Sequence, residues 1–255
     1  MKKPAVLQPT DEAIVVGKVF NTPLVAKGKT WYPAVQLLTW PIMAWFAKKR
    51  LPERSWVQSL GVGALTMAIV LGSEWCHNLA HAAAARMVGK PMDAIRITWG
   101  LPLLVYYDIN DEKVTPRQHI IRALGGPVFN LLVLPIAIYY KYHTDPKSAA
   151  RDMANAAVGT NAFLPAVGLL PIPGIDGGPI LKWSLVEKGQ TPKEADKIVR
   201  KVDGVLGIFL TLAGFCHSKN DVGLLEDCWC SLPPSPSALH WASSKRVNNP
   251  ISLQN

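Results

Sequence analysis

The sequence predicts an α-helical polytopic membrane protein, with a core of four to five membrane spans and a short β-hairpin at the membrane interface. Three observations lead to this fold class. The chain of 255 residues is 49% hydrophobic, which is unusual for a soluble enzyme of this length. Its apolar residues gather in runs of roughly 17 to 25 residues, the length that a helix needs to cross the hydrocarbon core of a bilayer. Basic residues lie between these runs.

The distribution of charge favours a membrane topology over nucleic-acid binding. The formal net charge is +9, but the Lys and Arg residues lie between apolar segments rather than in one stripe. We therefore expect the lipid bilayer as a partner and no nucleic acid. Lys and Arg are more numerous in residues 1–30, 88–118 and 174–201 than in the other loops, which predicts that these segments face the cytoplasm.

Four apolar runs give the expected spans, and a fifth run is short for one. The runs cover residues 31–47, about 55–87, about 119–140, 156–172 and 202–215. The second run would be about 45 Å long as a helix, so its last third is expected to tilt or to emerge at one interface. Gly and Pro at residues 125–127 are expected to break the third helix, and a proline-rich stretch at 170–174 ends the fourth.

Short strands are expected on either side of the first two spans. Residues 94–99 and 103–107 predict a hairpin with its turn at 100–102. Such a hairpin must lie at the interface or in a cavity lined by protein, because lipid cannot satisfy its backbone polar groups. Alternating residues at 13–20 predict one or two further strands near the membrane surface.

The composition divides the chain into three parts. Residues 1–30 form an N-terminal juxtamembrane segment, and residues 31–215 form the membrane domain. Residues 216–255 are rich in Ser, Pro and Asn without a helical period, which predicts a disordered tail. Residues 179–201 are expected to return to water, with a helix beginning at the Thr-Pro-Lys-Glu capping box at 191–194.

Two histidines in the second run carry the strongest chemical signal. His77 and His81 are four residues apart, so both lie on one face of a helix and can bind one metal ion. The spacing is that of the His-Glu-x-x-His helix of zinc proteases, but Asn78 stands in the place of the Glu. Two histidines at this spacing, without further motifs, more often make a packing or polar contact in an apolar helix than a metal site.

Two later motifs favour a metal site at the two histidines. The third run contains Gly-Pro-x-x-Asn at residues 126–130, and the proline-rich break ends in Asp-Gly-Gly at 176–178. In this order, over roughly residues 55–215, the chain resembles the site-2 protease family of intramembrane zinc metalloproteases. The resemblance implies that zinc is bound by His77, His81 and Asp176. It also implies that a transmembrane protein or peptide is the substrate.

The resemblance extends to two asparagines. Asn130 ends the Gly-Pro-x-x-Asn motif, and Asn161 corresponds to the first Asn before the family's Asp-Gly motif. Both are expected at substrate-binding positions. Gly168 departs from the pattern, because the family usually has a second Asn there.

The other departure concerns catalysis. The family uses the Glu of its first motif as general base, and the amide of Asn78 cannot accept a proton at neutral pH. Glu74 lies one helical turn before His77 and is the candidate substitute, either as the base or as a hydrogen-bond partner that orients His77. A solvated acid at a helix bend is the alternative for Glu74.

The expected function follows from these residues. The resemblance implies intramembrane proteolysis, with catalysis impaired at Asn78, in a multi-pass protein of a bacterial cell membrane whose site lies toward the cytoplasmic side. The alternative is a pseudoprotease that binds transmembrane segments of partner proteins without cutting them. A membrane oxygenase would need more histidines than six, and a transporter would be expected to show internal repeats, which the chain lacks.

Overall fold

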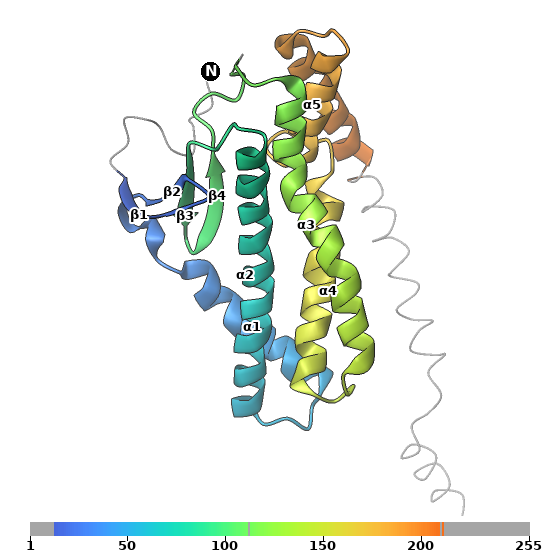
Figure 1. The fold of residues 1–255 in the computed structure, drawn as a ribbon. Coiled ribbons are helices and arrows are strands. Elements are labelled where there is room, and N and C mark those ends of the chain that lie inside the picture. Colours follow the sequence, from blue (N-terminus) through green and yellow to red (C-terminus); the bar gives the residue numbers. More distant parts are fainter. Residues whose placement is uncertain (1–12, 112, 210, 212–255) are drawn as a thin grey trace, which may run out of the picture. The chain divides into compact units, whose positions relative to one another are not determined.

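The computed structural model describes residues 13–111, 113–209 and 211, and most of these residues are helical. The expected tail at 216–255 lies outside the described residues. The chain divides into one compact unit that ends at Asp203 and a second that begins at Gly204. All the labelled elements of Figure 1 belong to the first unit.

Three helices form the centre of this unit. α2, α3 and α4 contact one another and alternate in direction, and α1 packs against α2 (Figure 1). α5 contacts α3 beside the C-terminal end of α2. The bounds are α1 Ala34–Arg50, α2 Trp56–Met87, α3 Pro116–His143, α4 Ala149–Gly168 and α5 Gly177–Glu187, with a short 3-10 helix at Gly28–Trp31.

Two of the described helices, α2 and α3, are long and apolar enough to cross a membrane. In each, only 28% of the most apolar window is buried inside the protein. A core helix of a soluble protein would be mostly buried, so the exposed apolar surface of these two helices is consistent with a lipid environment.

Local sequence sets where the two long helices begin. Ser55 caps α2 and Thr115 caps α3, and each forms a reciprocal capping box with a glutamine three residues later. Pro116 follows Thr115 at the first helical position, where its missing N–H removes no helical hydrogen bond. Close packing of α1 on α2 requires Gly63, because a Cβ there would lie 2.5 Å from the backbone nitrogen of Ala44.

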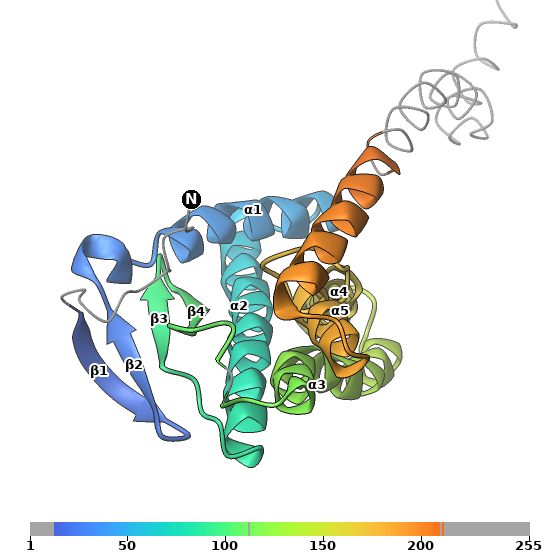
Figure 2. The ribbon, with the colours of Figure 1, turned by 90° about the horizontal axis from the view of Figure 1, so that it is seen from above.

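A four-stranded sheet lies beside the C-terminal half of α2, as Figure 2 shows from above. Its order is β1-β2-β3-β4, and only the central β2–β3 pair is parallel. Its core residues include Ile95, which is fully buried. The strands are β1 Ile14–Val19, β2 Thr22–Ala26, β3 Ala94–Thr98 and β4 Leu101–Val105. Both predicted strand regions are therefore present, and the sheet joins them.

The turn of the β3–β4 hairpin comes earlier than predicted. It consists of Trp99 and Gly100, both with positive φ, as the common two-residue hairpin turn requires. Pro102 lies within β4 instead of the turn, which is tolerated because β4 is an edge strand of the sheet. The carbonyl of Gly100 accepts hydrogen bonds from the side chains of Gln36 in α1 and Trp75 in α2, which fixes the turn against both helices.

Two further sequence expectations were wrong. α3 continues through Gly125, Gly126 and Pro127, because packing against α2 and α4 holds the helix together despite the missing proline N–H. α4 begins at Ala149, before the apolar run expected at 156–172, because Ser148 caps it. Residues 177–187 form α5, and the capping box predicted at Thr191 and Glu194 is confirmed.

Buried contacts hold α5 in place within the protein. Trp183 stacks on His119 of α3, with ring centroids 3.8 Å apart. Lys182 is also buried, and its Nζ lies 2.6 Å from Asn110 Oδ1 and 2.9 Å from Asp196 Oδ1. A buried ammonium needs such partners, so Lys182 joins α5 to the loop before α3 and to the helical residues after 191.

Candidate metal centre

Two histidines of α2 and the aspartate that precedes α5 meet near the C-terminal end of α2. His77 Nε2 and His81 Nε2 are 3.1 Å apart, and Asp176 places Oδ2 3.4 Å from the first and Oδ1 3.2 Å from the second. Ligand atoms around a tetrahedral zinc are about 3.3 Å apart when the bonds are about 2.0 to 2.1 Å long. The ligand atoms of these three side chains all lie within 4.8 Å of one another, a spacing that suits a metal ion.

Hydrogen bonds on the far side of each imidazole assign its protons. His77 Nδ1 faces the Oδ1 of Asn130, and His81 Nδ1 lies 2.8 Å from the carbonyl oxygen of Arg122. Both oxygens are acceptors, so each Nδ1 donates its hydrogen to them and each Nε2 presents a lone pair toward Asp176. The backbone nitrogen of Gly126 also lies 3.3 Å from His81 Nδ1, a longer contact than the one to the Arg122 carbonyl. Two lone pairs and a carboxylate at these distances repel one another unless a cation lies between them. This donor set therefore fits zinc.

A chain of buried amides supports His77. Asn130 and Asn161 are 0% and 1% exposed, and Asn130 Nδ2 donates to Asn161 Oδ1 over 2.8 Å. Asn161 Nδ2 in turn donates to the carbonyl of Ala157 and to the hydroxyl of Ser73. Because the Nδ2 of Asn130 is engaged with Asn161, its Oδ1 is directed at His77, which fixes the orientation of that imidazole. The sequence reading had no role for Ser73.

Glycines let the backbone approach the histidines. A Cβ at Gly126 would lie 2.4 Å from His81 Nε2 and 2.5 Å from His77 Nε2. A Cβ at Gly125 would lie 2.6 Å from the carbonyl oxygen of Ala80. α3 can therefore cross α2 at the metal centre only with glycine at both positions. The sequence predicted a helix break at these glycines, whereas small residues in an apolar helix also indicate close helix packing.

We expect the substitution Gly126→Ala to weaken zinc binding by about 10- to 100-fold, because the added methyl group displaces both imidazoles from Asp176. Titration of the purified protein with zinc in a competing chelator measures this change. Gly72→Ala in α2 is the matched control, because a Cβ there meets nothing within 4 Å. Unchanged zinc affinity in Gly126→Ala would contradict the geometry of the site.

The loop before α5 holds Asp176 by close backbone contacts. A Cβ at Gly177 would lie 2.2 Å from the carbonyl oxygen of Leu170, and one at Gly178 would lie 2.3 Å from that of Ile172. Gly168, the position where an Asn was expected from the resemblance, faces the same carboxylate. A Cβ there would be 3.1 Å from Asp176 Oδ2. The departure at Gly168 therefore falls next to the metal centre.

The two candidate catalytic residues are bonded to each other. Asn78 is buried, and its Nδ2 donates to the carbonyl oxygen of Glu74 over 2.9 Å and to Glu74 Oε1 over 3.0 Å. Glu74 is only partly buried. The amide of Asn78 thus holds the carboxylate of Glu74 next to position 78 on α2, one helical turn before His77.

Arg122 and Tyr106 adjoin the centre and were missed in the sequence. The Arg122 carbonyl orients His81, while its buried guanidinium lies over the Tyr106 ring at 4.0 Å. Burial raises the pKa of the Tyr106 hydroxyl, and the positive charge of Arg122 opposes this shift. Tyr106 therefore stays protonated at neutral pH. Tyr106 directly follows β4 and Arg122 lies in an apolar helix, and no sequence pattern connects the two.

The described residues form a mostly helical fold with two candidate membrane spans, and they bring together two buried imidazoles and one half-buried carboxylate. Among solved structures, the chain is similar to the site-2 protease from Methanocaldococcus jannaschii, with 14% sequence identity and a TM-score of 0.45, covering 96% of this chain and 99% of that one. No protein-family model matches the chain, and no curated protein matches it. The functional assignment therefore rests on the side chains of the site.

Proposed function

We propose that the chain is a membrane-embedded zinc metallopeptidase of the site-2 protease type, which cleaves membrane proteins and whose catalysis is slowed by Asn78. One observation carries this proposal: His77, His81 and Asp176 direct two lone pairs and a carboxylate at one point. Three protein ligands leave a fourth position open, which is the arrangement of catalytic rather than structural zinc. The sequence motifs resemble those of the site-2 protease family in the same order.

Zinc held by these three residues would supply a Lewis acid that polarises a peptide carbonyl and activates water. The chain's own residues prepare the site for it. Asn130 and the Arg122 carbonyl keep both histidines in the tautomer that binds metal. That Asn130 and Asn161 also bind substrate stays a prediction, since their amides are engaged within the site.

We assign the role of general base to Glu74. Its carboxylate can accept a proton, whereas the amide of Asn78 cannot. Asn78 binds Oε1 of Glu74 and so restrains the carboxylate near the histidines. Glu74 lies one helical turn before position 78, where the resembled family has its Glu. A base at this place is expected to be less well aligned with the water at the metal, which accounts for slow rather than absent catalysis.

We propose four to five spans. α2 and α3 supply two of them. α1 and α4 have 17 and 20 residues, which gives lengths of about 25 and 30 Å and is close to the thickness of the hydrocarbon core. The chain would be a multi-pass protein of a bacterial cell membrane, with the metal centre toward the cytoplasm, because the loops at that end carry more Lys and Arg.

Cleavage of a fluorogenic transmembrane peptide by the protein in detergent tests the proposal. We expect slow cleavage that stops on chelation and returns with zinc. Glu74→Gln should reduce the rate by about 10²- to 10⁴-fold, because the base is lost while the hydrogen bond to Asn78 can be kept. The exposed Glu187→Gln, far along α5, is the control. Cleavage that persists in Glu74→Gln would show that Glu74 is not the base.

The second candidate function is a pseudoprotease, and Asn78 is the observation that favours it. In that case the same site would bind metal, and the protein would retain membrane clients uncut. Recovery of intact clients by crosslinking in the membrane, without cleavage by any variant, would support this reading. Chelator-sensitive cleavage by the unmodified protein would exclude it.

A further inference from the structure

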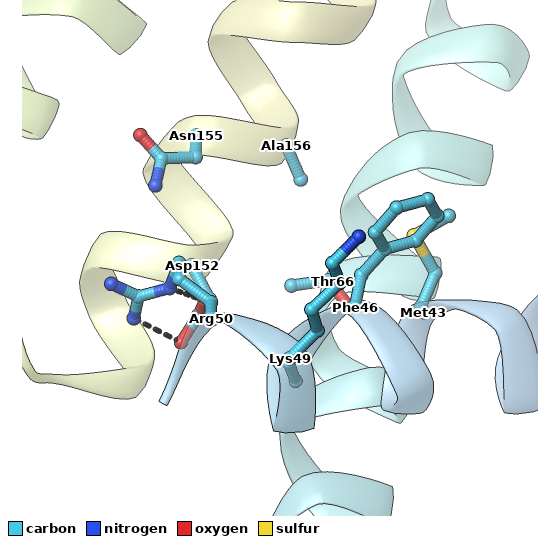
Figure 3. A pocket seen from close by; sticks show the side chains of 9 residues that line it. Met43, Phe46, Lys49, Arg50, Thr66, Asp152, Asn155 and Ala156 are labelled. Atoms are coloured by element: carbon cyan, nitrogen blue, oxygen red, sulfur yellow. Dashed lines mark hydrogen bonds and ion pairs between the residues drawn. The ribbon is translucent and has the colours of Figure 1, made fainter. Parts of the chain in front are cut away.

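A pocket of about 530 Å³ lies between α1, α2 and α4, at the opposite end of α2 from the metal centre. Most of its surface is apolar, and ligand pockets for small molecules commonly have volumes of about 300 to 1,000 Å³. Figure 3 shows Met43 and Phe46 of α1 on one side and Ala156 of α4 on the other. Exposed side chains form part of the rim, including Phe46 and Lys49, so the pocket opens to the surface of the protein.

One end of the pocket is polar and positively charged. Arg50 donates to both carboxylate oxygens of Asp152, and Arg54 Nη1 lies 2.6 Å from Asp152 Oδ2. Figure 3 shows Arg50 against Asp152, and with Arg54 two guanidinium groups share this one buried carboxylate. Lys49 adds a third cation at the rim, and within the described part of the chain no carboxylate lies within ion-pair distance of its Nζ.

The end of α1 and the turn after it keep an excess of positive charge. Residues 48–54 carry four cations and one carboxylate, and Asp152 of α4 adds a second carboxylate. The cations are Lys48, Lys49, Arg50 and Arg54, and the carboxylate of this stretch is Glu53. The donors of Arg50 and Arg54 are largely engaged with Asp152 and with backbone carbonyls, and Lys48 Nζ donates to the carbonyls of Pro52 and Arg54. Lys49 is thus the cation with its hydrogen-bond donors available at the mouth of the pocket.

Aromatic residues mark this level as the membrane interface. Lys49 Nζ lies 5.1 Å from the ring centre of Trp45, and Lys48 Nζ lies 6.0 Å from that of Trp56. Trp and Lys at the ends of apolar helices occupy the headgroup region of a bilayer. The charged end of the pocket is then at headgroup depth. The apolar part, which reaches Thr66 on α2, lies deeper in the hydrocarbon region.

We propose that this pocket binds an anionic phospholipid. The phosphate would lie against Lys49 and the outer edge of Arg50, and an acyl chain would lie among Met43, Phe46 and Ala156. A basic, apolar-floored pocket between membrane helices is complementary to such a lipid in both charge and polarity. A soluble anion would match only the rim, and an uncharged lipid only the floor. This inference does not depend on the peptidase proposal.

Binding of defined lipids to the detergent-purified protein, measured by native mass spectrometry, tests the inference. The probes are phosphatidylglycerol, phosphatidylcholine with the same chains, and glycerol phosphate without chains. We expect phosphatidylglycerol to bind more tightly than both. Lys49→Gln should lower its affinity about fivefold, the effect of one basic residue near a membrane surface. Ala156→Phe should abolish binding by filling the pocket.

Two controls match these variants. Lys141→Gln removes a charge at the same end outside the pocket, and Leu132→Phe adds bulk on the exposed face of α3. Both should bind phosphatidylglycerol as the parent does. Equal affinity for the two phospholipids, equal affinity for glycerol phosphate, or unchanged binding in Lys49→Gln would each overturn the proposal. Lys49 is exposed, so its substitution should leave the fold intact.

Discussion

Replacing His77 and His81 together by alanine is expected to remove zinc from the purified protein. The parent should contain about one zinc per chain, and the double variant none. Each substitution removes one lone pair that converges with Asp176, and a single carboxylate does not retain zinc against water. Elemental analysis of protein purified in detergent without chelators measures the metal content directly.

His143→Ala is the matched control for this experiment. His143 is an exposed histidine near the C-terminal end of α3, where its Nδ1 contacts the carbonyl of Tyr139. Its loss should leave the zinc content unchanged. A parent protein that holds no metal under these conditions, or a double variant that still holds it, would show that the three side chains do not form the site.

The substitution Asn78→Glu is expected to raise the rate of peptide cleavage by about 10²- to 10⁴-fold, which is the usual contribution of a positioned general base. The amide of Asn78 is a hydrogen-bond donor to Glu74, whereas a glutamate there can accept a proton from water at the metal centre. Single-turnover cleavage of a transmembrane peptide separates this chemical step from binding of the peptide.

The neighbouring carboxylate requires a second variant. With glutamate at position 78, it and Glu74 would repel each other unless they share a proton. The double variant Asn78→Glu/Glu74→Gln restores one donor and one acceptor with the roles exchanged, and it should be at least as active as the single variant. If neither variant exceeds the parent rate while zinc content is unchanged, a missing base at position 78 is not what limits this protein.

Local sequence determined the parts of the structure that depend on neighbours in the chain. The apolar run from about 55 to 87 predicted α2, because continuous apolar composition specifies a long helix without help from elsewhere, and in the structure Ser55 caps its start. The four-residue spacing placed His77 and His81 on one face of that helix. The hairpin and β1 followed from alternation, whereas β2 lies after the stretch in which strands were expected.

The resemblance to a known family, rather than any periodicity, connected Asp176 to the histidines, and only the tertiary structure brings these three side chains together. The same holds for the parallel pairing of β2 with β3, for the continuity of α3 through Pro127, and for the bonds that link Asn130 to Asn161. Each depends on packing between segments that are distant in the chain, and no local pattern encodes which surfaces meet. Gly126 shows the reason most clearly, since its lack of a side chain has meaning only when α2 lies against it.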